Sequence, residues 1–442
     1  MRDPIFKRLL DLHPKFSDLS LVRIKKLLKK LKFDENKIPK VIHIAGTNGK
    51  GSTASIIKSL LNEHGKTTHI YSTPHLVRFN ERIQLYSKDI SDRLLLKYLY
   101  HCEKINQNNL ITYFEITTTA AFMAFQDHPA DFLILEVGLG GRFDATNIIK
   151  NKKYSLITPI SMDHQDYLGN SLTKIAYEKL SIINKRSINF INYQKPIVKK
   201  FAKNFLHKKN MQAKIAGSDW KIKNNYYVDP TNKINLKNLS LRGFHQYENA
   251  GLAIALVKNI LKDSFNEIVV QQALPKIQWA GRLQKIHKGK LTKTLHRYDS
   301  ILLDGFHNID GAKVFIKNLK GKNNFLICSF LVNKNYKTIL KLLEPHFKKI
   351  LITPMEEENS IQSTNVKKTN RISISKGLLE AINDLNIQTN ANSTIYFGGS
   401  LYFIGEVLRF NQKNNIEDTA HFYGTRSYAS FWKFLSCWKN WC

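Results

Sequence analysis

The chain has 442 residues, with 68 lysines and arginines against 35 aspartates and glutamates, and a formal net charge of +33. This length predicts two or three domains, and an apolar content of 43% excludes a wholly disordered polybasic chain. No apolar run approaches the roughly 18 residues that a membrane-spanning helix needs. The N-terminal segment, which contains Asp3 and Asp11, does not have the pattern of a signal or transit peptide. Four cysteines, two of them in the last six positions, do not make a disulfide framework. We therefore expect a soluble, cytoplasmic protein with no membrane partner.

The first element in chain order is an amphipathic helix over residues 20–33. Ile24, Leu28 and neighbouring leucines repeat at intervals of three and four, so one face is apolar and the other is rich in lysine. Asp18 or Ser20 can cap its start. We expect this helix to dock on the protein rather than on a membrane.

Strands and helices alternate through the first half of the chain. Apolar or β-branched runs predict strands at 41–46, 68–73, 131–138 and 154–160. A glycine-rich turn follows the first of these strands and opens a helix that ends near Gly65. Alternation of this kind favours a parallel sheet covered by helices.

The same alternation starts again after about residue 285. Short apolar strands are expected at 299–305, 323–330, 348–354 and 393–399, separated by helical stretches. The fold class is therefore α/β, with a parallel sheet in the N-terminal domain and a second, smaller α/β domain after it. We place these domains at 1–290 and 291–418, and residues 419–442 form an aromatic and cysteine-containing tail to which we assign no role.

The positive charge peaks in the middle of the chain, with 13 basic and 2 acidic residues from Lys185 to Lys237. A basic surface attracts anions such as nucleic acid, acidic lipids or small polyanionic substrates. Because these residues are mostly scattered lysines without interleaved aromatic side chains, they favour solvated surface over a nucleic-acid site.

The strongest functional signal is the glycine-rich turn IAGTNGKGS at 44–52. Such a turn between a buried strand and a helix presents backbone N–H groups to phosphate oxygens, and the helix dipole adds to the attraction. Lys50 can reach the terminal phosphates, and Ser52 can offer a hydroxyl to Mg²⁺. The strict Walker pattern fails here, because Gly51 separates Lys50 from Ser52 and Ile44 stands at its first glycine. The predicted phosphate-binding residues are Gly46, Thr47, Asn48, Gly49, Lys50, Gly51 and Ser52.

This GTNGKGS turn is followed, in order, by further motifs over nearly the whole chain. They are YSTPHLVRFNERI (71–83), TYFEITTTAAF (112–122), LEVGLGGRFDATN (135–147), ITPISMDHQDYLG (157–169), IAYEKLSI (175–182), FHQYENA (244–250), WAGRLQ (279–284), LLDGFHN (302–308) and GGSLYFIGEVLR (398–409). In this series the chain resembles the folylpolyglutamate synthase/dihydrofolate synthase family of the Mur ligase superfamily, which forms amide bonds with ATP. The resemblance implies an N-terminal P-loop-type ATPase domain with a parallel sheet and a smaller Rossmann-like α/β C-terminal domain.

A metal site is expected beside the phosphate turn. Glu136 ends a buried strand that faces this turn, the usual place for a metal-binding acid in nucleotide enzymes. The resemblance implies that Thr73, Glu136 and His164, together with Ser52, hold Mg²⁺. It also implies that Lys179 carries an N-carboxylated side chain, so that Lys50, Lys179 and His164 form the predicted catalytic set. The distal motifs imply ATP contacts at Asn249, Arg282 and Asp304, and a planar guanidinium such as that of Arg282 suits phosphate oxygens.

The resemblance implies a reaction with ATP, L-glutamate and folates. A substrate carboxylate is phosphorylated to an acyl phosphate, and the amino group of L-glutamate then displaces phosphate to give an amide. The acceptor is dihydropteroate, a folate tail or both, and we favour the bifunctional enzyme. The residues that resemble those of bifunctional members, and that we expect at the pterin or folate site, are Asp18, Leu19, Ser20, Phe114, Glu115, Phe143, Asp144 and Ala145.

Three alternatives stay open at this point. The first is a monofunctional folylpolyglutamate synthase. The second is a peptidoglycan-precursor ligase, which the sequence GLGGRFDATN disfavours. The third is a non-catalytic, basic protein that binds nucleotide or nucleic acid. We expect small-molecule substrates, no nucleic-acid partner and a monomer.

Overall fold

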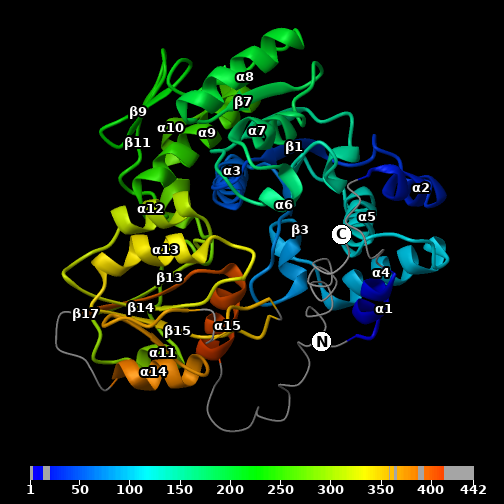
Figure 1. Cartoon of the computed structure of the whole chain (residues 1–442). Helices are drawn as coiled ribbons and strands as arrows, with labels where there is room; N and C mark the ends of the chain where they lie inside the picture. Colours follow the sequence, from blue (N-terminus) through cyan, green and yellow to red (C-terminus); the bar gives the residue numbers. More distant parts are fainter. Residues whose placement is uncertain (1–2, 13–19, 358, 363–365, 387–392, 413–442) are drawn as a thin grey trace. The chain divides into compact units, whose positions relative to one another are not determined.

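The computed structural model describes residues 3–12, 20–357, 359–362, 366–386 and 393–412. The chain divides into two compact units, one spanning residues 3–279 and the other beginning at Ala280 (Figure 1). The sequence-based boundary lies at 290, and the roles that it assigns to the two domains stay predictions. Asp18, Leu19 and the 419–442 tail fall outside the described residues.

The first unit is built on an eight-stranded sheet in the order β4-β3-β2-β5-β1-β6-β7-β8. The strands from β2 to β8 in this order run parallel, whereas β3 and β4 pair antiparallel at one edge. Their bounds are β1 (Lys40–Ala45), β2 (Thr68–Tyr71), β3 (Ile83–Leu85), β4 (Lys88–Asp89), β5 (Phe132–Glu136), β6 (Tyr154–Ile157), β7 (Ile188–Ile191) and β8 (Lys214–Ile215).

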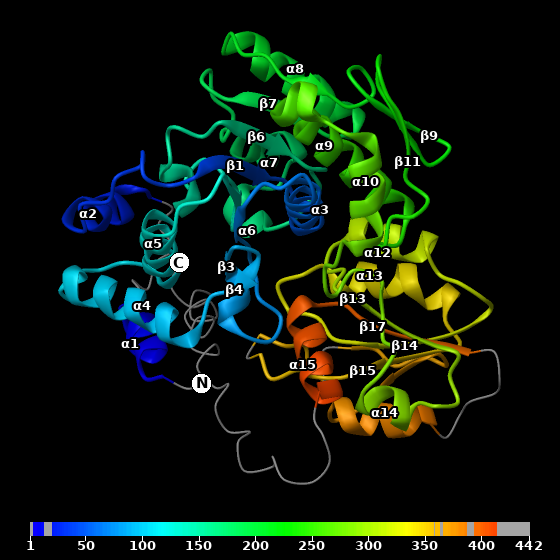
Figure 2. The ribbon, with the colours of Figure 1, turned by 180° about the vertical axis from the view of Figure 1, so that it is seen from behind.

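Helices cover both faces of this sheet, and its central strands are therefore buried on both sides. Ile42 and Ile44 of β1 join a core with α3 and α9, while Ala45 joins a second core with α7 and α8. Figure 2 shows α3, α9 and α10 grouped together beside β1. The helices of this unit are α1 (Ile5–Asp11), α2 (Val22–Lys30), α3 (Lys50–Glu63), α4 (Asp92–Asn106), α5 (Tyr113–Asp127), α6 (Gln165–Leu168), α7 (Leu172–Leu180), α8 (Pro196–Lys208), α9 (Phe244–Leu261) and α10 (Glu267–Ala273).

A small antiparallel sheet lies within the basic segment of the chain. It consists of β9 (Lys221–Lys223), β10 (Tyr226–Val228) and β11 (Lys233–Asn235), with β10 in the centre. Its inward residues Tyr227 and Ile234 join the core that contains α3 and α9. Part of the lysine-rich composition therefore belongs to short strands with one solvated face.

The second unit has a six-stranded sheet in the order β12-β13-β17-β14-β15-β16, parallel except for β12. In Figure 1, α12 and α13 lie on one face of this sheet, and α11 and α14 lie on the other. The elements are β12 (Gln284–Lys285), α11 (Lys290–Thr294), β13 (Ser300–Asp304), α12 (Ile309–Lys317), β14 (Asn323–Cys328), α13 (Tyr336–Leu343), β15 (Lys349–Ile352), β16 (Ile372–Ile374), α14 (Leu378–Asn386), β17 (Ser393–Gly398) and α15 (Leu401–Gln412).

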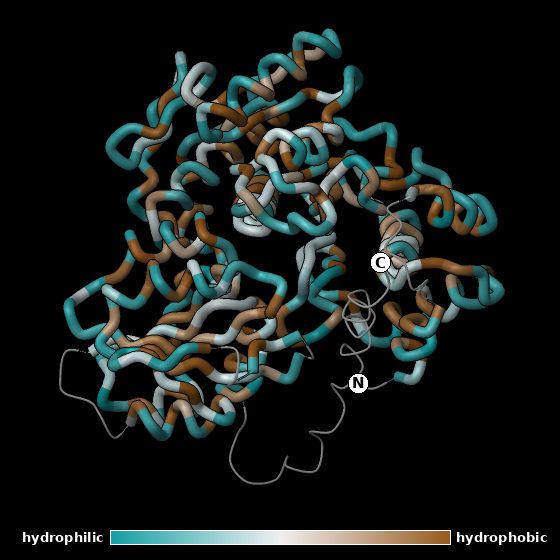
Figure 3. Tube along the Cα trace, viewed as in Figure 1, coloured by the Kyte–Doolittle hydropathy of each residue, from teal (hydrophilic) through white to brown (hydrophobic). Residues whose placement is uncertain are grey.

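The predicted α/β fold class is confirmed. Each of the eight strands expected from apolar runs is present, as β1, β2, β5, β6, β13, β14, β15 and β17. The hydropathy colouring of Figure 3 shows brown, apolar stretches along these strands and teal on the outer turns. The helix expected at 20–33 is shorter, Val22–Lys30, and the Ser20 hydroxyl accepts a hydrogen bond from Val22 N at 3.1 Å. No helix in the described ranges has both the length and the apolarity to cross a bilayer.

Candidate active site

The loops after four parallel strands meet at one edge of the large sheet. Ile44 pairs with Glu136, Ala45 with Ile157 and Tyr71 with Leu135. The carboxyl ends of β1, β5, β6 and β2 are therefore aligned, which is the usual location of ligands in open α/β sheets. The glycine-rich turn, Thr73, Glu136 and His164 all follow these ends.

The glycine-rich turn is packed so closely that side chains do not fit at three of its positions. A Cβ atom on Gly46 would lie 1.9 Å from Thr158 Oγ1, and one on Gly49 would lie 2.6 Å from Asn249 Oδ1. Gly49 has φ +86°, in the left-handed region that favours glycine. A Cβ atom on Gly51 would lie 2.6 Å from Cζ2 of Trp279. The turn is thus fixed by the loop after β6, by α9 and by the Trp279 indole.

The hydrogen bonds of the turn show which of its donors are already used. Thr47 N and Asn48 N both donate to Pro159 O, at 2.9 and 3.2 Å, and Thr47 Oγ1 donates to Ser161 O at 3.1 Å. The N–H groups of the first turn of α3 have no intrahelical acceptor. Phosphate binding by this segment would therefore rely on N–H groups from Gly49 onward and on the positive end of the helix dipole.

Lys50 is directed toward the buried carboxylate of Glu136. Its ammonium donates to Gly46 O at 3.2 Å and to Thr47 O at 3.4 Å, and it lies 3.9 Å from Glu136 Oε1. Glu136 is 3% exposed, and its Oε2 accepts from Thr73 N at 3.4 Å. Three of the residues that the sequence singled out, Lys50, Thr73 and Glu136, are therefore brought together.

The predicted metal-binding residues supply one carboxylate, two hydroxyls and one imidazole. Glu136 and Ser52 are buried, and His164 adjoins the buried carboxylate of Asp163, with its Nε2 3.8 Å from Asp163 Oδ2. Among the described residues, no three His, Cys, Asp or Glu side chains cluster to hold a metal, and the predicted set has only two residues of these types. A mainly oxygen donor set with one buried carboxylate suits Mg²⁺, so these residues fit the ion.

Lys179 lies on α7 and is 4% exposed. The 138–147 loop packs on this helix, since Arg142 N donates to Glu178 O at 3.0 Å and the Arg142 guanidinium pairs with Glu178 Oε1 at 3.1 Å. Burial raises the pKa of the Glu178 carboxyl, opposed by the charges of Arg142 and Lys179. A buried lysine is unusual, and its N-carboxylation stays a prediction.

The residues expected to contact ATP fall into both units. Asn249 is buried on α9, next to Gly49, and its Nδ2 donates to Gln246 Oε1 at 3.0 Å. Asp304 ends β13 in the second unit, where its two oxygens accept from Leu283 N and Phe306 N, each at 2.9 Å. Burial raises the pKa of Asp304, and the charge of Arg282 opposes this shift.

Of the predicted acceptor residues that the structure describes, Ser20 precedes α2, and the others occupy two further segments of the first unit. Phe114 packs so closely on Gly138 that a Cβ atom there would lie 2.5 Å from its ring. Glu115 caps α5 by accepting from Thr112 N at 2.8 Å, and it also accepts from Arg23 Nε at 3.0 Å. Its Oε1 is buried and has no hydrogen-bond partner in the part of the chain that the structure describes.

The second acceptor segment is the loop after β5. Phe143 is 38% exposed, and the Arg142 guanidinium lies 4.3 Å from the centre of its ring. Asp144 is 4% exposed and accepts from Leu139 N at 2.8 Å and Thr146 N at 3.0 Å, so its carboxylate holds its own loop in shape. Ala145 is buried beside it at the start of a 3₁₀ turn, η2 (Ala145–Ile148).

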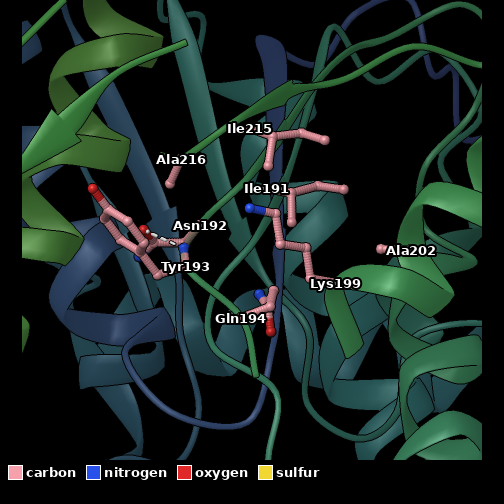
Figure 4. A pocket seen from close by; sticks show the side chains of 8 residues that line it. All are labelled: Ile191, Asn192, Tyr193, Gln194, Lys199, Ala202, Ile215 and Ala216. Carbon is pink, nitrogen blue, oxygen red and sulfur yellow. Dashed lines mark hydrogen bonds between the residues drawn. The ribbon is translucent and has the colours of Figure 1, made fainter. Parts of the chain in front are cut away.

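A small cavity lies at the carboxyl ends of β7 and β8, beside α8 (Figure 4). Gln194, which lines it, donates to Thr158 O and accepts from Ile160 N, both at 3.0 Å. This side chain therefore braces the loop after β6 that supports the glycine-rich turn. The cavity is lined by Ile191, Asn192, Tyr193, Gln194, Lys199, Ala202, Ile215 and Ala216.

Sequence reasoning did not single out several side chains that support this site. Trp279 contacts Gly51, Gln194 holds the loop after β6, and Asp163 adjoins His164. Asp163 and Trp279 stand in the quoted motifs at 157–169 and 279–284, and Asp163 also adjoins a predicted ligand. Gln194 had no such signal, and Gln194 and Trp279 act through contacts between residues far apart in the chain.

Comparisons with known proteins show which family this chain resembles. Residues 44–257 match the model of the Mur ligase middle domain. The chain is 30% identical over 425 residues to a Bacillus subtilis protein named dihydrofolate synthase/folylpolyglutamate synthase, covering 88% of this chain and 94% of that protein. It is also 29% identical to the dihydrofolate synthetase of Saccharomyces cerevisiae, covering 90% and 99% of the two chains.

A solved structure shows the same fold. The folylpolyglutamate synthase of Mycobacterium tuberculosis, complexed with ADP and AMPPCP, superimposes with a TM-score of 0.80 at 26% identity and covers 92% of this chain and 98% of that chain. The sequence similarity extends over both units, as does the fold. The chain therefore belongs to the dihydrofolate synthase/folylpolyglutamate synthase family of ATP-dependent acid–amino-acid ligases.

Proposed function

We propose that this chain joins L-glutamate to dihydropteroate and also extends the glutamate tail of folates, using ATP. The observation that carries the proposal is the convergence of Lys50, Glu136 and Thr73 at the sheet edge beside a glycine-rich turn. Members of the family named in both ways, as dihydrofolate synthase and as folylpolyglutamate synthase, support the two acceptors.

The chemistry follows from the poor reactivity of a carboxylate. An acceptor carboxylate oxygen attacks the γ-phosphorus of ATP, and the bond to the bridging oxygen breaks to release ADP. The amino group of L-glutamate then attacks the acyl carbon, loses a proton and expels phosphate to form the amide. Most of the acceleration in such transfers comes from positioning and from stabilisation of charge.

The side chains of this site have distinct proposed roles. Lys50 would neutralise charge on the transferred phosphoryl group, and the N-terminus of α3 would hold phosphate oxygens. Glu136, Thr73, Ser52 and His164 would hold Mg²⁺, which when bound neutralises phosphate charge. Lys179, if N-carboxylated, would add a negative group on α7. Asn249 would contact the nucleotide beside Gly49, and Arg282 and Asp304 are the other residues that we propose to contact ATP.

The acceptor site would involve the two segments around Phe114 and Phe143. Phe114 and Glu115 begin α5, and the aromatic ring of Phe143 is accessible to a ligand. Both segments resemble those of bifunctional family members, which is why we propose the dihydropteroate reaction in addition to tail extension. We also propose a monomeric, cytoplasmic enzyme, and sedimentation of the purified protein tests the monomer.

The test uses the purified full-length chain with ATP, Mg²⁺ and L-glutamate, and with dihydropteroate or tetrahydrofolate as acceptor. Phosphate release that depends on glutamate, together with a product heavier by one glutamyl residue, supports the proposal. Reactions without glutamate and reactions with Glu136→Gln are the controls. Turnover with tetrahydrofolate but not dihydropteroate would show a monofunctional enzyme, and no turnover with either acceptor overturns the ligase proposal.

A further inference from the structure

A line of four buried polar side chains runs from residues outside the 138–147 loop to residues within it. Lys152, His43, Thr146 and Asp144 are 4%, 0%, 0% and 4% exposed. Lys152 Nζ lies 3.4 Å from His43 Nδ1, and His43 Nε2 lies 2.9 Å from Thr146 Oγ1. Thr146 Oγ1 donates in turn to Asp144 Oδ1. The line connects the strand that leads into the glycine-rich turn with the loop that carries proposed acceptor residues.

The hydrogen bonds along this line have one consistent direction. Burial lowers the pKa of His43 well below its usual range, and the charge of Lys152 lowers it further, so the imidazole is neutral. An ammonium has only donors. His43 Nδ1 therefore accepts from Lys152, and its Nε2–H donates to Thr146 Oγ1. The Thr146 hydroxyl donates in turn to Asp144. A cation and a carboxylate are thus joined through two neutral groups in a buried hydrogen-bond network.

This line holds the 138–147 loop at both ends. Asp144 accepts from Leu139 N near the start of the loop. Lys152 donates to Asn147 Oδ1 at its end, and Asn147 Nδ2 donates to Arg142 O at 3.0 Å. Phe143 projects from the middle of the loop that these bonds constrain. A buried hydrogen-bond network of this kind favours a single conformation of the loop.

The charges around Lys152 agree with a structural cation. Burial lowers the pKa of Lys152 to about 8, and the nearby carboxylate of Glu35 opposes this shift. Glu35 also accepts from Asn151 N, so it belongs to the same end of the line. At the other end, burial raises the pKa of Asp144, and the hydrogen bonds from Leu139 and Thr146 oppose this shift. Neither end contacts the phosphate-binding turn in the described structure.

We propose that Lys152 and His43 are positioning residues that act through Thr146 and Asp144 to hold the 138–147 loop in the conformation that binds the pterin- or folate-bearing acceptor. This proposal rests on the proposed function. Since the four side chains support the acceptor loop rather than the phosphate turn, they set the KM for the acceptor and leave the KM for ATP nearly unchanged.

The first test compares Lys152→Met, Thr146→Val and Thr146→Ser in the full-length enzyme. Valine keeps the shape of threonine without its hydroxyl, and serine keeps the hydroxyl. We expect Lys152→Met and Thr146→Val to raise the acceptor KM by about tenfold or more, with less than about a twofold change in the KM for ATP. Thr146→Ser should keep an acceptor KM close to that of the wild type. If the threonine methyl group were what matters, Thr146→Ser would raise this KM instead.

The second test does not depend on activity. Hydrogen exchange should become faster across residues 138–147 in Lys152→Met and Thr146→Val, but not in α3 and not in Thr146→Ser. Should Lys152→Met fail to fold, the two Thr146 variants carry both tests.

The outcomes separate this proposal from the proposed function. An active wild type whose variants keep the acceptor KM overturns the positioning role and leaves the function standing. An inactive wild type overturns the proposed function, and exchange rates then decide whether the line holds the loop. Unchanged exchange at 138–147 in both Lys152→Met and Thr146→Val overturns the positioning role in either case.

Discussion

Lys50 Nζ lies 3.9 Å from Glu136 Oε1, across the loops that follow β1 and β5. This separation is longer than a hydrogen bond, and the ammonium is held instead by the carbonyls of Gly46 and Thr47. The two opposite charges are therefore close enough to compensate each other.

The first prediction concerns this pair. Lys50→Met and Glu136→Gln should each reduce glutamate-dependent phosphate release by at least about 100-fold, because Lys50 would neutralise charge on the transferred phosphoryl group and Glu136 would hold the Mg²⁺ that does the same. Lys58→Met is the matched control, since Lys58 is the other lysine of α3 and donates to Gln84 rather than to the turn. Wild-type rates in Lys50→Met or Glu136→Gln would disprove the proposed site.

The second prediction tests the packing of Trp279 on the turn. An alanine inside a helix is ordinarily more stable than glycine by roughly 0.5–1 kcal/mol, but a Cβ atom on Gly51 would lie 2.6 Å from the indole. Gly51→Ala should therefore weaken nucleotide binding, measured by titration calorimetry. In a Trp279→Leu background the clash is removed, so Gly51→Ala should weaken nucleotide binding less than it does in the wild type. The control is therefore Trp279→Leu alone, and the double variant Gly51→Ala/Trp279→Leu is compared with it. Equal affinities for Gly51→Ala and the wild type would contradict the predicted clash.

The third prediction concerns Lys179. If this buried lysine is N-carboxylated, ¹³C-bicarbonate should give a carbamate signal in the NMR spectrum that is absent in Lys179→Met. Turnover should also fall in that variant, by about 100-fold if the added negative group takes part in charge stabilisation. Lys174→Met, which changes the exposed lysine on the same helix, should keep both the signal and the rate. A missing signal in an active wild type would refute carboxylation.

The fourth prediction concerns pH and the second unit. Burial raises the pKa of Glu406 to about 7. The charge of Glu356 adds to this shift, and a hydrogen bond from the backbone of Glu356 opposes it. Because the folded-state pKa is above the unfolded value, the stability that this group contributes is fully present below about pH 4.3 and is lost as pH rises through about 7. Glu406→Gln should therefore become more stable than the wild type as pH rises through this range.

Urea unfolding of both proteins at a series of pH values measures this difference. Glu380→Gln is a suitable control, because Glu380 is exposed on α14. A stability difference between Glu406→Gln and the wild type that does not change with pH would count against the raised pKa.

The central strands could be predicted from sequence because each is a short, nearly continuous apolar run. β1, β5, β14 and β17 are buried on both faces, so local composition is sufficient to identify them. The hairpin β3–β4 and the three-stranded sheet of β9, β10 and β11 were not predicted, since each of these strands is only two or three residues long. Such short strands form through pairing with neighbours rather than through their own composition.

The same distinction applies to the site. The turn, Glu136 and Lys179 carry motif signals, and the structure brings Lys50 of the turn together with Glu136 and Thr73. The contact of Gly51 with Trp279 and the line from Lys152 to Asp144 depend on residues that come together only in the fold. The two oxygens of Asp304 likewise brace neighbouring backbone, which its position at a strand end did not predict.

The packing around the glycine-rich turn has a consequence for how a nucleotide is captured. Thr158, Asn249 and Trp279 each contact a different glycine of the turn, and the Pro159 carbonyl accepts from two of its N–H groups. The turn is therefore pre-organised, so that little conformational freedom has to be lost there when the phosphates arrive. Discrimination among nucleotides must then come from groups outside the turn, because a rigid phosphate cradle treats all triphosphates alike.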